Sequence, residues 1–162
     1  QMTHLIAYAL DGIAFSSEIL VGESIGKRQY NYYRKIIRSC FKLGIIFSLI
    51  LSIFFVIFGF GMINLMTSLD EVRQICYNYL FWIIVTPILA LSSFLLDGIF
   101  LGAARGTEIR DAMIQSFIVF CISALIFVEM FGNQGLWASI AVFYVARGIT
   151  LKRYLHKINV LF

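Results

Sequence analysis

The sequence predicts an all-α fold: a polytopic transmembrane helix bundle with five spans. Of its 162 residues, 60% are hydrophobic and 14% are charged, and the mean hydropathy is +0.89. Soluble domains carry roughly 45–50% apolar and about 25% charged residues. Residues 43–69 and 74–96 contain no charge, and each run exceeds the roughly 20 residues that cross a bilayer. A soluble enzyme or DNA-binding domain of this size cannot bury so much apolar surface.

The individual spans follow from the charges and the turn signals. The opening stretch, residues 3–22, is apolar except for three residues, and the runs 112–128 and 130–146 are separated only by Glu129. Turn residues after Glu129 predict a helical hairpin there. The chain opens on apolar sequence without Met or a signal peptide, so we expect a fragment that begins inside a helix. The expected spans form one partial transmembrane lobe, residues 1–162, and are 2–25, 40–63, 73–101, 112–130 and 135–152.

The distribution of basic residues predicts the orientation. Five spans place 12 of the 13 basic residues on one side, and only Arg73 lies on the other. By the positive-inside rule, the basic side and the C-terminus are expected to be cytosolic. Topology and contact with anionic lipid explain this charge, so no nucleic acid is expected as a partner. The twelve residues are Lys27, Arg28, Arg34, Lys35, Arg38, Lys42, Arg105, Arg110, Arg147, Lys152, Arg153 and Lys157.

Three acidic residues inside the spans are the candidate substrate or cation sites: Asp11, Glu18 and Asp97. A carboxylate in hydrocarbon costs at least about 2.5–3.5 kcal/mol, so such residues face a bundle interior or a wet cavity. Asp11 and Glu18 lie seven residues apart and share one helix face. The alternative is that they pair with basic residues at an interface, Asp97 with Arg105 and Glu18 with Lys27. Supporting candidates on the same stripes are His4, Tyr79, Thr86 and Ser93.

The remaining motifs predict packing rather than chemistry. Glycines at four-residue spacing, Gly22/Gly26 and the run from Gly98 to Gly106, predict close contact between helices. Pro87 predicts a kink in the third span, either a hinge or a packing feature. The sequence shows no catalytic arrangement, and its three cysteines lack metal-ligand spacing. No enzyme activity, metal or cofactor is therefore expected.

Two strings resemble the DinF-like branch of the multidrug and toxic compound extrusion (MATE) family. Residues 8–18, YALDGIAFSSE, with the glycines that follow, are similar to the eighth helix of that branch. Residues 95–113, LLDGIFLGAARGTEIRDAM, are similar to its tenth helix and the loop after it. The family fold has twelve helices in two lobes around a central cleft. The resemblance implies that this chain is helices eight to twelve, without the N-terminal lobe and the seventh helix.

The resemblance also implies a function. Family members export organic, often cationic compounds by proton- or sodium-coupled antiport, so we expect multidrug efflux from a bacterial inner membrane. The implied partners are the lipid bilayer, the N-terminal lobe and a small organic substrate. A lipid-linked saccharide flippase of the same superfamily is the alternative, and it would prefer a basic cleft. A non-transporting membrane scaffold is a second alternative, and it would tolerate loss of the intramembrane acids.

Overall fold

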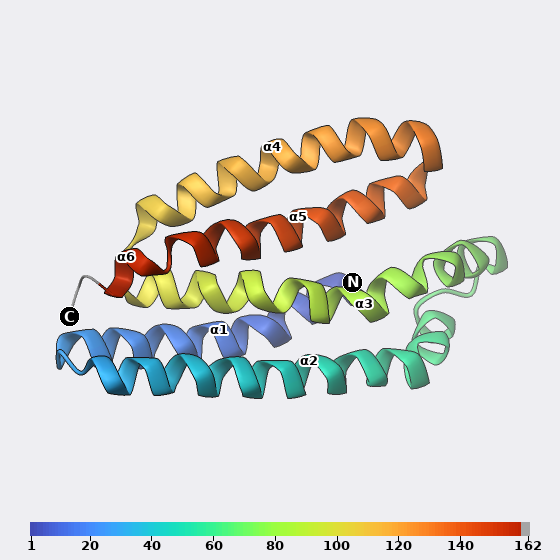
Figure 1. Ribbon diagram of the computed structural model, residues 1–162. Helices are drawn as coiled ribbons and strands as arrows, with labels where there is room; N and C mark the ends of the chain where they lie inside the picture. The colour runs from blue at the N-terminus through green and yellow to red at the C-terminus, as the bar shows by residue number, and fades with distance from the viewer. Residues whose placement is uncertain (160–162) are drawn as a thin grey trace.

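The computed structural model describes residues 1–159 and is helical almost throughout. Its five long helices run side by side along one axis (Figure 1), which confirms the all-α bundle. Each expected span lies within one helix, while residues 160–162, the C-terminus of the expected lobe, lie outside the described part. The helices are α1 (Met2–Gly26), α2 (Tyr30–Met66), α3 (Asp70–Gly102), α4 (Gly106–Phe131) and α5 (Asn133–Tyr154), followed by the short α6 (His156–Asn159).

Four helices, α1 to α4, are long and apolar enough to cross a membrane. The fifth expected span, α5, is less apolar because it contains Arg147, Lys152 and Arg153. The composition of α5 alone does not mark it as a membrane span, but its packing places it in the bundle. It packs against α4 along one side and α3 along the other, as Figure 1 shows. It therefore belongs to the bundle, antiparallel to α4.

The turns at the two ends of the bundle are short. The segment between the first two expected spans, 26–39, is mostly helix, because α2 begins at Tyr30 and only three residues separate it from α1. Arg28 and Ala104, with φ of 52° and 53°, reverse the chain after α1 and α3. Gly132, with φ of 58°, alone separates α4 from α5. A positive φ is cheapest for glycine, so the hairpin expected near Glu129 forms here.

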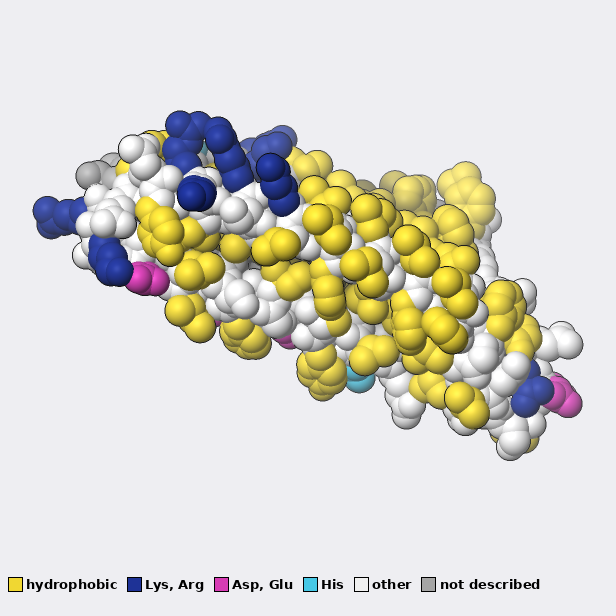
Figure 2. Space-filling view, turned by 90° about the horizontal axis from the view of Figure 1, so that it is seen from below, with side chains coloured by type: hydrophobic (Ala, Val, Ile, Leu, Met, Phe, Trp, Pro, Cys, Tyr) yellow, Lys and Arg dark blue, Asp and Glu magenta, His cyan; other side chains and the backbone are white. Residues whose placement is uncertain are grey.

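The bundle is apolar outside as well as inside. Large apolar side chains of α2 and α4 are exposed along most of their length, and on a soluble protein such a surface would drive association. Figure 2 shows hydrophobic side chains over the middle of the molecule and Lys and Arg gathered at one end. This pattern is that of a protein whose solvent is a lipid bilayer. Within the described residues, the basic end holds the junctions α1–α2, α3–α4 and α5–α6.

Small residues let the helices approach closely. A Cβ added to Gly98 would lie 2.2 Å from the carbonyl oxygen of Ala14, and one added to Gly102 would lie 2.3 Å from that of Glu18. The predicted packing role is thus confirmed for Gly98 and Gly102. It is wrong for Gly26 and Gly106, which have nothing within 4 Å. The backbones of α1 and α3 touch along this seam.

Buried serines other than Ser52 satisfy their hydroxyls within their own helices. Ser17, Ser93 and Ser116 donate hydrogen bonds of 2.7 Å to the backbone carbonyl three or four residues earlier. An unpaired hydroxyl in an apolar interior is costly, and this local bond removes the cost without needing a partner helix. Serine acts here as a small residue that permits close packing.

Candidate functional site

The three predicted acidic residues line one pocket of about 310 Å³. α1 contributes Asp11 and Glu18, α3 contributes Asp97, and Arg147 reaches in from α5. The glycine seam brings α1 and α3 together here, since Ala14 and Gly98 also line the pocket. The seven-residue spacing therefore places both α1 carboxylates toward α3.

Asp97 pairs with Arg147, fifty residues later in the chain. The guanidinium donates from Nε to Oδ2 at 3.0 Å and from the second terminal nitrogen to Oδ1 at 2.9 Å. The Arg147 side chain is only 13% exposed and that of Asp97 26%. Such a bidentate ion pair is among the stronger side-chain interactions, and it joins α3 to α5 within the bundle.

The expected pairing of Asp97 with Arg105 is wrong. Arg105 lies beyond the end of α3 and faces Glu108 at 3.6 Å and the carbonyl oxygen of Lys157 at 3.4 Å. Arg147, counted in the sequence among the basic residues of the cytosolic side, reaches the pocket from α5 and also contacts the sulfur of Met113 on α4. Sequence reasoning thus missed a pocket residue, because nothing local distinguishes Arg147 from its basic neighbours.

Asp11 and Glu18 differ from Asp97 in having no partner. Among the described residues, neither carboxylate makes a hydrogen bond or an ion pair. The alternative pairing of Glu18 with Lys27 is wrong, because Lys27 bonds Glu23 at 2.5 Å. That bond raises the pKa of the Lys27 ammonium. The pocket therefore combines one neutralised carboxylate with two that remain available to a cation.

The supporting candidates lie elsewhere. Thr86 and Ser93 donate to carbonyl oxygens of their own helix, those of Trp82 and Ala90. Tyr79 stacks on Trp137, with ring centroids 6.0 Å apart, and His4 is exposed beside Tyr8. None of the four lines the pocket of the three acids. Helix α3 continues through Pro87 without interruption, and a hinge role remains a prediction.

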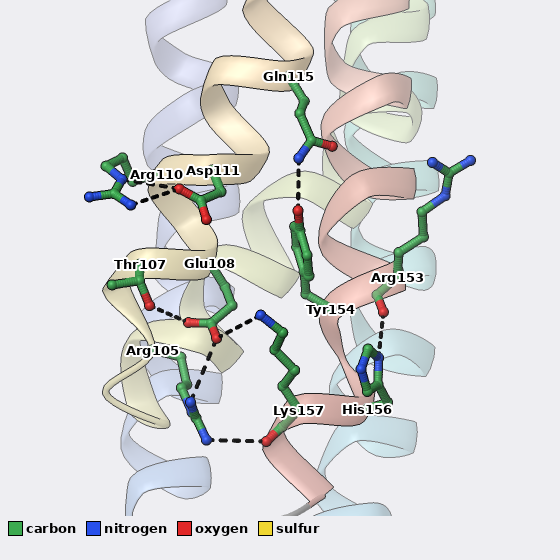
Figure 3. Close-up of polar contacts among 10 residues, drawn as sticks. All are labelled: Arg105, Thr107, Glu108, Arg110, Asp111, Gln115, Arg153, Tyr154, His156 and Lys157. Atoms are coloured by element: carbon green, nitrogen blue, oxygen red, sulfur yellow. Dashed lines mark hydrogen bonds and ion pairs between the residues drawn. The ribbon is translucent and has the colours of Figure 1, made fainter.

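A second polar cluster closes the basic end of the bundle. Glu108 is buried and accepts a 2.7 Å hydrogen bond from the Thr107 hydroxyl. Arg105 and Lys157 lie 3.6 and 3.5 Å from its other oxygen, as Figure 3 shows. The cluster ties the start of α4 to α6, and its two cations share the single carboxylate of Glu108. Among the described residues, no group of His, Cys, Asp and Glu is arranged to hold a metal ion.

A helix bundle with an apolar exterior and ionisable residues at a pocket between its helices defines an integral membrane protein with a candidate ion or substrate path. The MatE family model matches residues 1–128. The chain is also 34% identical over 145 residues to DNA damage-inducible protein F of Escherichia coli (strain K12), covering 90% of this chain. The chain belongs to the MatE (MATE) family, which confirms the resemblance drawn from its eighth- and tenth-helix strings.

The match covers only a share of the relative's own length. The chain spans 31% of the length of the Escherichia coli relative. No solved structure matches it significantly. Members of the family are membrane transporters rather than enzymes.

Proposed function

We propose that this chain forms part of the C-terminal lobe of a secondary active efflux transporter. The full-length protein would export organic, often cationic compounds in exchange for protons or sodium ions. The observation that carries the proposal is the pocket between α1 and α3, where Asp11 and Glu18 are unpaired beside the neutralised Asp97. A carboxylate that binds either a coupling cation or a cationic substrate, but not both, couples the two fluxes.

The two alternative functions, a flippase and a scaffold, account less well for the residues of the acidic pocket. A lipid-linked saccharide flippase would favour a basic cleft, whereas the single arginine of this pocket is already bonded to Asp97. A scaffold has no need of unpaired carboxylates in an apolar bundle, where each is costly. The scaffold predicts that removing the charges of Asp11 and Glu18 leaves function intact.

The orientation forms part of the proposal. With the basic end cytosolic, Thr107 at the start of α4 would lie on the cytosolic side and Asn133 at the start of α5 on the external side. The test is single cysteine substitution at each position in full-length protein without native cysteines, followed by an impermeant thiol reagent on intact cells. We expect labelling at 133 and protection at 107. The reverse pattern would overturn the orientation.

The functional test is charge removal at Asp11. In full-length protein, we expect Asp11→Asn to abolish drug resistance at normal membrane expression, because the amide keeps the shape and cannot exchange a cation. Glu18→Gln should be weaker, and Asp97→Asn weakest in transport or defective in assembly. Glu23→Gln is the matched control on the same helix, since Glu23 bonds Lys27 outside the pocket. Normal export by Asp11→Asn with none by Asp97→Asn would place the site on α3 instead.

A further inference from the structure

The face of α3 opposite the acidic pocket carries a long apolar groove. Its deeper part, about 600 Å³, lies between α2, α3 and α5, and its lining includes Phe41, Leu96 and Ile149. A second hollow of about 350 Å³ shares Leu89, Val145 and Ile149 with the first and continues along α5 to Ala141. The two hollows therefore form one continuous groove on the outside of the described bundle.

The length of the groove fits half of a bilayer. From Lys152 to Ala141 the groove follows eleven residues of α5, about 16 Å at the rise of an α-helix. Half of a roughly 30 Å hydrocarbon core is about 15 Å. The groove thus runs from the basic end of the molecule to about the middle of the membrane, which is the depth that one acyl chain occupies.

The mouth of the groove, at the basic end of the bundle, carries positive charge. Lys152 lines the groove where α5 approaches the basic end. Arg34 lies three residues before the groove-lining Ile37 on α2, with its guanidinium 5.9 Å from the centroid of the Tyr30 ring. Among the described residues, neither cation forms an ion pair, and no carboxylate lines either hollow.

The acidic residues at this end are already engaged: Glu23 with Lys27, Glu108 with Arg105 and Lys157, and Asp111 with Arg110. Among the described residues, the unpaired Asp11 and Glu18 line the acidic pocket and not the groove, so neither of them neutralises its mouth. Positive charge above an apolar groove therefore lacks a complement within the described chain.

We propose that this groove binds an anionic phospholipid, with one acyl chain along α5 and the phosphate at Lys152. Basic pockets between helices at the membrane surface bind anionic headgroups, and each Lys or Arg near the surface strengthens the attraction about fivefold. The apolar wall excludes a soluble phosphate as the main occupant, because most of the contact area lies along hydrocarbon. The site is separate from the acidic pocket, since it uses the opposite faces of α3 and α5.

The experiment is lipid titration of the full-length protein in detergent, monitored by native mass spectrometry. The probes are dioleoyl phosphatidylglycerol, dioleoyl phosphatidylcholine, dihexanoyl phosphatidylglycerol and inorganic phosphate. We expect the long-chain anionic lipid to bind at least fivefold more tightly than the long-chain zwitterionic lipid. The short-chain lipid and phosphate should neither bind comparably nor displace it.

Two pairs of variants locate the site. Lys152→Gln should remove most of the anionic preference, whereas Arg153→Gln, an exposed neighbour outside the groove, should retain it. Val145→Trp should weaken binding of both long-chain lipids by filling the junction of the two hollows. Val119→Trp is its control, because Val119 on α4 is also 40% exposed and lines neither hollow. Equal effects within either pair, or equal binding of short- and long-chain lipid, would overturn the proposal.

Discussion

The two sides of α3 meet their neighbours in different ways. Toward α1, glycines bring the backbones into contact, and the pocket beside this seam holds three carboxylates and one arginine. Toward α5 and α2, aliphatic and aromatic side chains border an open groove with Lys152 at its end. Closely packed backbone holds polar groups in place, while loosely covered apolar surface is stable only because hydrocarbon surrounds it.

The comparison predicts that stability depends on the polar side of α3 more than on the apolar side. Three substitutions in full-length protein test this, each read as a change in thermal unfolding in a fixed detergent. They are ordered from the largest expected effect to the smallest.

Breaking the Asp97–Arg147 pair should have the largest effect. Arg147→Gln leaves the Asp97 carboxylate unpaired inside the bundle, and removing one partner of a buried pair costs about 3 kcal/mol. The double variant Asp97→Asn with Arg147→Gln should recover much of that loss, because no charge is left uncompensated. A double variant less stable than Arg147→Gln would show that the pair does not act as a unit.

Widening the glycine seam should have an intermediate effect. Gly98→Ala places a methyl group 2.2 Å from the backbone oxygen of Ala14, and backbone cannot give way as a flexible side chain can. Overpacking of this kind costs about 2 kcal/mol. Gly106→Ala is the matched control from the same four-residue series, with nothing within 4 Å. Equal destabilisation by both changes would contradict the close contact of α1 with α3.

Truncation in the groove should have the smallest effect. Ile149 is 50% exposed, so Ile149→Ala should change the unfolding free energy by less than about 0.5 kcal/mol. The matched variant is Ile99→Ala on α3. The Ile99 side chain is fully buried, so its truncation leaves a cavity and lowers the unfolding free energy by about 2 kcal/mol or more. A large loss at Ile149 would mean that another part of the full-length protein covers the groove.

The sequence by itself predicted the helices and much of the acidic pocket. Charge-free runs longer than a bilayer leave no alternative to membrane helices, because backbone polar groups in hydrocarbon must bond within the segment. The seven-residue interval between Asp11 and Glu18 defines one helix face without any knowledge of the fold. These are local properties of the chain, so they can be read from it directly.

Only the tertiary structure decided which charged residues form ion pairs. Sequence proximity favoured Arg105 as the partner of Asp97 and Lys27 as the partner of Glu18, and both pairings are wrong. Asp97 meets Arg147 because α5 packs between α3 and α4, and the register of that contact depends on close approaches such as Gly148 against Ser92. The groove arises in the same way, from three helices whose positions no local pattern encodes. Pairings across fifty residues depend on packing between helices, and packing is a property of the whole bundle.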